Sequence, residues 1–358
     1  MPELVLPPVS ILKDAGAILK DAGAILKDAG AIIVLVACSL LYSFLNGLHD
    51  GANTVATVIT SRALPPRFAL WMVAAAELSG PFVFGVAVAK TIGAGVVDPQ
   101  AITVMTVVAA LVGASAWNVL TWRLGIPASS SHALIGGLLG SVITRSAFRL
   151  DLLHAPGLIK VASGLFLAPV VSLAAAYVVM EVTRFLLRSA TPRVNWFFGR
   201  AQLVTTIGLA LSHGANDAPK TMGIIVMGLV SAGLLPEFGV PGWVIAATAV
   251  ALAAGTLLGG WRLIRTLGTR FYRVRPIHAF TSQITSGLVV FSASVTGLPV
   301  STSHVVSSAI AGVGAAERFN KVRWRVMREI VVGWLLTIPA TAIAGGLVFL
   351  ALNGLFGS

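Results

Sequence analysis

Long apolar runs dominate the sequence and restrict the folds that are open to it. A chain inside a lipid bilayer must satisfy its backbone hydrogen bonds internally, so such runs are expected to form α-helices. Asp, Glu, Lys and Arg make up only 11% of the 358 residues, against about 25% in a typical soluble domain. We therefore predict an all-α integral membrane protein. Ten apolar segments are expected roughly at 32–60, 68–92, 101–122, 127–144, 157–187, 201–230, 241–261, 278–298, 300–315 and 330–352.

The linkers between these segments differ in charge. Two of them, 93–100 and 231–242, contain an acid and neither Lys nor Arg. The basic linkers lie at 61–67, 188–200, 262–275 and 317–328. Because basic loops face the cytoplasm in membrane proteins, this pattern explains the net charge of +12 without a nucleic-acid partner.

Two motifs occur twice, in the same order. NGLHDGANTVAT (46–57) matches SHGANDAPKTMG (212–223) when Asp50 is placed on Asp217, an offset of 167 residues. LGIPASSSH (124–132) matches TGLPVSTSH (296–304) at an offset of 172. Two motifs repeating at nearly one offset indicate a duplicated unit. With five segments in each unit, the second copy enters from the opposite side, which predicts two inverted repeats whose binding site lies at the midplane.

This duplication divides the chain into four predicted parts. Residues 1–31 form an N-terminal extension that contains ILKDAGA three times in tandem. We expect it to be helical or frayed, and an amphipathic surface helix is the alternative. The first inverted repeat covers 32–187, a basic cytoplasmic linker 188–200, and the second inverted repeat 201–358.

Three acids, Asp50, Glu77 and Asp217, lie deep inside apolar segments. An ionised side chain at the bilayer centre costs about 2.5–3.5 kcal/mol, and such residues usually mark ion or proton pathways. A structural ion pair between helices is the alternative. Gly214 and Pro219 flank Asp217, and we expect both motif-bearing helices to be broken at the midplane.

Helix breaks and serine clusters both favour an anion. A broken helix exposes free N–H groups at its N-terminus, and the PASSSH and PVSTSH blocks add hydroxyls, although N-capping alone would also explain the serines. The carboxylates at 50 and 217 would repel an oxyanion unless a cation entered with it. The residues themselves therefore favour symport of an oxyanion with a proton or sodium ion.

The four blocks HDGAN, GANDAPK, PASSSH and PVSTSH resemble those of the inorganic phosphate transporter (PiT) family, over about residues 32–352. This resemblance implies a phosphate symporter that needs no cofactor, driven by sodium ions or protons. It also implies binding residues. The phosphate set is Ser129, Ser130, Ser131, Ser301, Thr302, Ser303, Asn216 and Lys220. The coupling set is Asp50, Asn53, Asp217, Glu77 and His49, with sodium expected, if at all, at the first three.

The sequence departs from the sodium-coupled pattern at two positions. Lys220 stands where sodium-coupled members have Asn, the counterpart of Asn53. Gln283 falls where the family often has Glu, and we align it with Glu77 of the first half. Both changes remove an oxygen or a charge that suits sodium, so we predict proton coupling.

Several alternatives stay open from the sequence. The oxyanion is sulfate in one of them, and the coupling ion is sodium in another. A channel is less compatible with fixed charges in both halves, and an intramembrane serine hydrolase lacks a G-x-S-x-G elbow. The expected partners are inorganic phosphate and the lipid bilayer, and a homodimer stays open. The short linker at 188–200 lacks the long loop of eukaryotic relatives, so we predict a prokaryotic cytoplasmic membrane.

Overall fold

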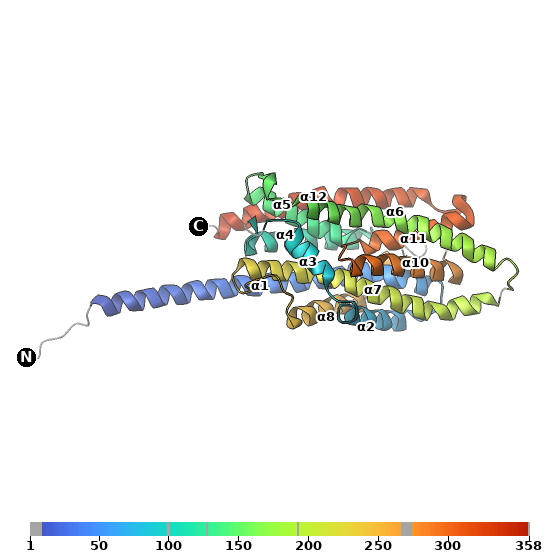
Figure 1. Ribbon diagram of the computed structural model, residues 1–358, viewed down its shortest axis with the longest axis horizontal. Helices are drawn as coiled ribbons and strands as arrows, with labels where there is room; N and C mark the ends of the chain where they lie inside the picture. Colours follow the sequence, from blue (N-terminus) through green and yellow to red (C-terminus); the bar gives the residue numbers. More distant parts are fainter. Residues whose placement is uncertain (1–8, 99–100, 127, 192, 266–273, 357–358) are drawn as a thin grey trace, which may run out of the picture.

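The computed structural model describes residues 9–98, 101–126, 128–191, 193–265 and 274–356, and these form an elongated bundle of α-helices (Figure 1). Its elements are α1 (Val9–Thr60), α2 (Pro66–Phe84), α3 (Ala87–Gly95), α4 (Val104–Leu124), α5 (Ser130–Arg145), η2 (Leu150–Leu152), α6 (Ala155–Leu186), α7 (Val194–Ser231), α8 (Gly242–Leu258), α9 (Trp261–Arg265), α10 (Pro276–Val295), α11 (Thr302–Arg318), η4 (Phe319–Lys321) and α12 (Trp324–Phe356).

The prediction of an all-α membrane protein is confirmed. Each of the ten predicted apolar segments overlaps an α-helix, and the second is divided between α2 and α3 after Gly85, which has a positive φ of 80°. Among the described residues, five helices are long and apolar enough to cross a membrane. They are Ala29–Thr60 of α1, and the whole of α2, α4, α6 and α12.

The helices that carry the aspartate motifs are continuous, which differs from the expected breaks. α1 contains residues 46–57 without interruption, and α7 passes through Pro219. Pro219 removes only the N–H that would bond to the carbonyl of residue 215, and helices in a membrane tolerate such a loss. The breaks occur instead before α5 and α11. There the chain turns at Gly125 (φ 68°) and Gly297 (φ 66°).

Helices of the two halves pack in reciprocal pairs. α1 packs on α8 and α7 on α2, while α5 packs on α12 and α11 on α6. Figure 1 shows α6 and α12 running in opposite directions along the bundle. Close backbone contacts follow the same exchange, because Gly47 of α1 lies against the backbone of Leu252 and Gly214 of α7 against that of Glu77.

The small residues of α5 form the packing surface that their spacing predicts. Gly136 and Gly140 lie against the backbone of α12 at Ile338 and Ala342. Such small residues let helix backbones approach closely within a membrane.

Gly140→Val is expected to destabilise the fold by about 1–3 kcal/mol, because a Cβ there would collide with the Ala342 backbone. Gly208→Val in α7 is the matched control, since a Cβ at Gly208 meets no atom within 4 Å. Thermal unfolding in detergent measures both. Equal unfolding temperatures for the two variants would show that α5 and α12 do not need this close approach.

Candidate functional site

Two helices begin inside the protein rather than at its surface. Ser129 caps α5 and accepts a hydrogen bond from the backbone N–H of His132 at 3.1 Å. Ser301 caps α11 in the same way, with the N–H of His304 at 3.4 Å. Both serines are buried. The Pro127 that precedes α5 lies outside the described residues. The serine blocks therefore serve as N-caps, and they also bring two helix N-termini into the interior, where the amides favour an anion.

Asp50 on α1 is surrounded by neutral donors. The hydroxyls of Ser130 and Ser303 both donate short hydrogen bonds to its carboxylate. The Asn53 amide donates to Asp50 Oδ1 at 3.2 Å, and His49 Nδ1 lies 3.1 Å from the same oxygen. Among the described residues, no Lys or Arg contacts this carboxylate.

Asp217 on α7 has a resident cation instead. The Lys220 ammonium lies 2.6 Å from Asp217 Oδ1, and it donates to Ser131 Oγ at 2.6 Å and to the Val300 carbonyl at 2.5 Å. Thr302 donates to the same carboxylate oxygen at 3.3 Å. An ammonium has three N–H donors, so all of its donors have an oxygen partner here.

The two aspartate clusters are related by an exchange of halves. Asn53 follows Asp50 by three residues and donates to Ser303 of the second half at 2.8 Å. Lys220 follows Asp217 by three residues and donates to Ser131 of the first half. The amide of Asn53 and the ammonium of Lys220 therefore occupy equivalent places. Each serine block supplies hydroxyls to both clusters, so the site is built from both halves together.

A histidine that the sequence-based set omitted connects the third acid to this site. His213 Nε2 lies 2.9 Å from Asp217 Oδ2, and its Nδ1 lies 2.6 Å from Glu77 Oε1. Thr256 donates to the other oxygen of Glu77 at 2.6 Å. The signal in the sequence was the four-residue spacing from His213 to Asp217, which places both on one face of a helix.

Two other predicted residues have neighbours that differ from those expected. The Asn216 amide donates to the Leu298 carbonyl at 3.2 Å, and its oxygen accepts from the Val300 N–H at 3.2 Å. Asn216 thus holds the segment that leads into α11. His49 Nε2 lies 3.4 Å from Thr121 Oγ1, on the side away from Asp50.

The alignment of Gln283 with Glu77 is wrong. Gln283 lies on α10, donates to Thr57 Oγ1 at 2.9 Å and accepts from Thr205 at 2.6 Å. By the reciprocal packing of α1–α8 and α7–α2, the residue that occupies the place of Glu77 is Leu252. Both lie against the backbone of a motif glycine. The second half therefore carries an apolar residue where the first half carries its third acid.

The whole constellation is enclosed by protein. Every predicted site side chain, and that of His213, is at most 3% exposed. Buried charges of this kind persist only when they are paired or strongly hydrogen-bonded, and the contacts above meet that condition. A ligand can therefore reach these groups only when the helices around them separate.

The same four motif blocks occur in known proteins. The sequence profile described as the phosphate transporter family matches residues 46–345. The chain belongs to the phosphate transporter family. Members of this family are transporters, not enzymes, and the buried serines beside His132 and His304 accordingly have no role as hydrolase nucleophiles.

Several bacterial relatives in this family match nearly the whole chain. A probable low-affinity inorganic phosphate transporter of Rhizobium meliloti is 41% identical, covering 88% of this chain and 95% of its own. One from Bacillus subtilis is 38% identical, covering 90% and 98%. The fold also matches a solved structure described as the sodium-dependent phosphate transporter, with a TM-score of 0.82 at 22% identity, covering 91% of this chain and all of that one. This phosphate transporter family member is thus a multi-pass protein of the cell membrane.

Proposed function

We propose that this chain is a secondary active symporter of inorganic phosphate that couples transport to protons. The observation that carries the proposal is the difference between the two aspartates. Asp217 is paired with the Lys220 ammonium at 2.6 Å, whereas Asp50 has only hydroxyl, amide and imidazole neighbours.

The serine blocks and helix N-termini support phosphate as the cargo. Hydroxyls of Ser130, Ser131, Thr302 and Ser303 surround the two aspartates, and each can donate to an oxyanion if it releases its present acceptor. The N-termini of α5 and α11 add backbone N–H groups of the right polarity. Ser129 and Ser301 position these termini as caps. Asn216 acts indirectly by holding the approach to α11, and Lys220 adds a positive charge.

The uncompensated charge at Asp50 supports cation coupling. A phosphate anion approaching an ionised Asp50 meets like charge in a low-dielectric interior, which is strongly unfavourable. Protonation of Asp50 removes this repulsion and leaves a carboxylic acid that can donate to the phosphate. The proton then crosses the membrane together with the cargo.

The ammonium of Lys220 disfavours sodium at the second aspartate. Its nitrogen lies 2.5–2.6 Å from three oxygens, those of Asp217, Ser131 and Val300. A sodium ion at Asp217 would have to displace this ammonium. The fixed cation therefore performs permanently the role that a transported sodium ion would otherwise have.

The chain of contacts through His213 supplies a second place for a proton. An imidazolium at His213 would donate to Glu77 and Asp217 together, and a neutral imidazole would leave one carboxylate without this donor. We assign Asp50 as the carrier that moves with phosphate, and Glu77 with His213 as the group that stores a proton beside the site. His49 orients Asp50.

We propose that 32–187 and 201–358 are two inverted repeats joined by the linker at 188–200, with 1–31 as an extension. The exchanged helix pairs, the opposite directions of α6 and α12, and the exchanged contacts of Asn53 and Lys220 support this. Each repeat then contains six helices, because α3 and α9 are counted, rather than five segments. Rocking of one repeat on the other would expose the enclosed site to each side in turn.

Uptake into proteoliposomes tests the coupling ion. With an inward proton gradient and no sodium, we expect phosphate uptake at least about tenfold above that without a gradient, a difference of about 1.4 kcal/mol in driving force. An inward sodium gradient at equal pH on both sides is expected to add less than twofold. Strict dependence on sodium would overturn proton coupling while leaving phosphate as the cargo.

Sulfate is the remaining rival cargo. Phosphate near neutral pH can exchange a proton with Asp50, whereas sulfate has none to give. Excess sulfate is therefore expected to leave phosphate uptake unchanged in the same proteoliposomes. Strong competition by sulfate would favour a broader oxyanion permease.

A further inference from the structure

A groove on the outer surface of the bundle, away from the aspartate site, has a specific shape and charge. It lies between α1 and α4, encloses about 580 Å³, and its walls are formed largely by apolar side chains such as Leu41, Leu45, Val112 and Leu120. Leu41 is 53% exposed and Leu120 49% exposed. In a membrane protein these side chains face acyl chains, so the groove opens towards lipid.

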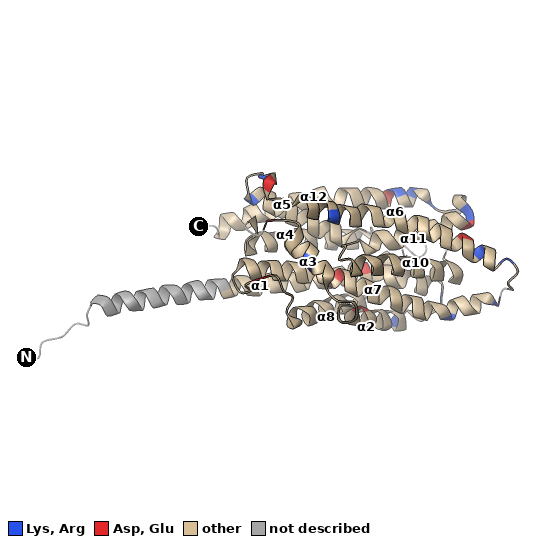
Figure 2. Cartoon of the chain, in the orientation of Figure 1, with Lys and Arg blue, Asp and Glu red and all other residues tan. Residues whose placement is uncertain are grey.

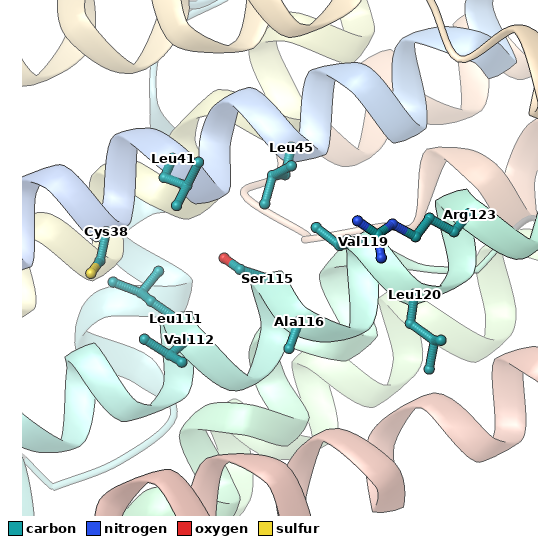
Figure 3. Close-up of a pocket in the computed structure, with 10 residues that line it drawn as sticks. All are labelled: Cys38, Leu41, Leu45, Leu111, Val112, Ser115, Ala116, Val119, Leu120 and Arg123. Carbon is teal, nitrogen blue, oxygen red and sulfur yellow. The ribbon is translucent and has the colours of Figure 1, made fainter. Parts of the chain in front are cut away.

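One charged side chain enters this apolar groove. Figure 3 shows the Arg123 guanidinium turned back along α4 towards Val119 and Leu45. Long basic side chains near helix ends normally extend towards water. No acid among the described residues pairs with Arg123. A guanidinium in apolar surroundings without a carboxylate is a strong bidentate site for a phosphate group.

The dimensions of the groove match one leaflet of a bilayer. Val112 and Arg123 are eleven residues apart on α4, which corresponds to about 17 Å along a helix. Half of the hydrocarbon core of a bilayer is about 15 Å. An acyl chain of one phospholipid would therefore fill the groove from its middle to the end at Arg123.

The end at Arg123 is the basic end of the molecule. The guanidinium of Arg262 donates to the Arg123 carbonyl, so the basic linker that begins at 262 lies against the end of α4. Trp122 packs with Leu263 and Ile264 in the same place. Figure 2 shows Lys and Arg gathered at the right-hand end of the bundle, where the basic linkers lie. Basic ends face the cytoplasm, whose leaflet carries the anionic lipids.

From this combination we infer that the α1–α4 groove binds one anionic phospholipid of the cytoplasmic leaflet, with an acyl chain between the helices and the headgroup phosphate on Arg123. The position gives the lipid a route to influence transport. α1 carries Asp50, and α4 leads through Gly125 to the N-terminus of α5. A chain wedged between α1 and α4 therefore stabilises one spacing of two helices that hold the site.

Native mass spectrometry of the purified full-length protein tests this inference directly. The protein is taken from micelles that contain phosphatidylglycerol or phosphatidylcholine, and the bound lipid is counted. We expect one phosphatidylglycerol per chain, and at least about fivefold less retention in Arg123→Ala, the effect of about 1 kcal/mol for one basic contact with an anionic lipid. Arg67→Ala, which changes an exposed arginine on another helix at this end, is the matched control and is expected to retain the lipid.

Leu120→Trp tests the groove separately from the charge. It fills the apolar wall, keeps Arg123, and is expected to lose the lipid while it elutes as the wild type does in size-exclusion chromatography. Equal retention of phosphatidylcholine, retention unchanged in both groove variants, or displacement of the lipid by millimolar inorganic phosphate would each overturn the inference. The assay uses no phosphate gradient, so its outcome is independent of the proposed symport.

Discussion

Asp50→Asn is expected to reduce proton-driven phosphate uptake at least about 100-fold, equivalent to about 2.7 kcal/mol. Asparagine keeps the size of the side chain and one acceptor oxygen, so Ser130, Ser303 and Asn53 can retain a partner. It cannot take up a proton. Because Asp50 contacts no Lys or Arg among the described residues, its charge has no other role in the resting structure than to attract a cation.

The measurement is the initial rate of phosphate uptake in proteoliposomes, together with thermal unfolding to show that the variant is folded. Glu181→Gln makes the same chemical change in an exposed pair with Arg184, 3.0 Å apart, and is expected to keep uptake within about twofold of the wild type, since exposed pairs contribute little. Uptake by Asp50→Asn within threefold of the wild type would contradict the assignment of Asp50 as the carrier.

The motifs predicted which residues meet, because repetition at a constant offset reports a duplicated structure. Asp50 and Asp217, 167 residues apart, lie in equivalent clusters that share the two serine blocks. The exchange of hydroxyls between halves was not predicted. Sequence offsets show which residues are equivalent, but not that Ser303 of one half reaches Asp50 of the other.

Local rules were less reliable for helix continuity. Pro219 and the motif glycines suggested breaks, yet α1 and α7 are continuous there. In water a proline costs a helix several kcal/mol, but inside a membrane the chain has no better alternative for its other backbone groups. The glycines serve packing instead. Gly47 and Gly214 allow helix backbones to approach Leu252 and Glu77.

The position of Glu77 also explains the wrong alignment with Gln283. Sequence comparison favoured a similar polar residue in a similar local context, whereas packing assigns equivalence by the helix pair to which a residue belongs. Leu252 shares no chemistry with Glu77, so no residue-level similarity could reveal the match. The asymmetry is informative, because only one half has an acid there, and His213 connects it to Asp217.

Lys220→Asn is expected to convert uptake from sodium-independent to sodium-dependent. Removal of the ammonium leaves Asp217 Oδ1, Ser131 Oγ and the Val300 carbonyl around one point, each of them 2.5–2.6 Å from the former nitrogen. Oxygen ligands at such distances suit a hard cation, and the new amide adds a fourth oxygen at the place equivalent to Asn53. Without sodium, we expect uptake to fall at least about tenfold, since a buried carboxylate that loses its partner is costly.

Lys220→Met separates this conversion from simple loss of the ion pair. Methionine fills a similar volume but offers no oxygen, so uptake is expected to be lost with or without sodium, and stability to fall by about 3–5 kcal/mol because Asp217 loses its cation. Sodium should restore uptake in Lys220→Asn alone, and it should also raise the unfolding temperature of that variant alone, since an ion that binds only the folded state stabilises it. If Lys220→Asn transports at the wild-type rate without sodium, the ammonium does not replace a transported cation, and the coupling must be explained by Asp50 and Glu77 alone.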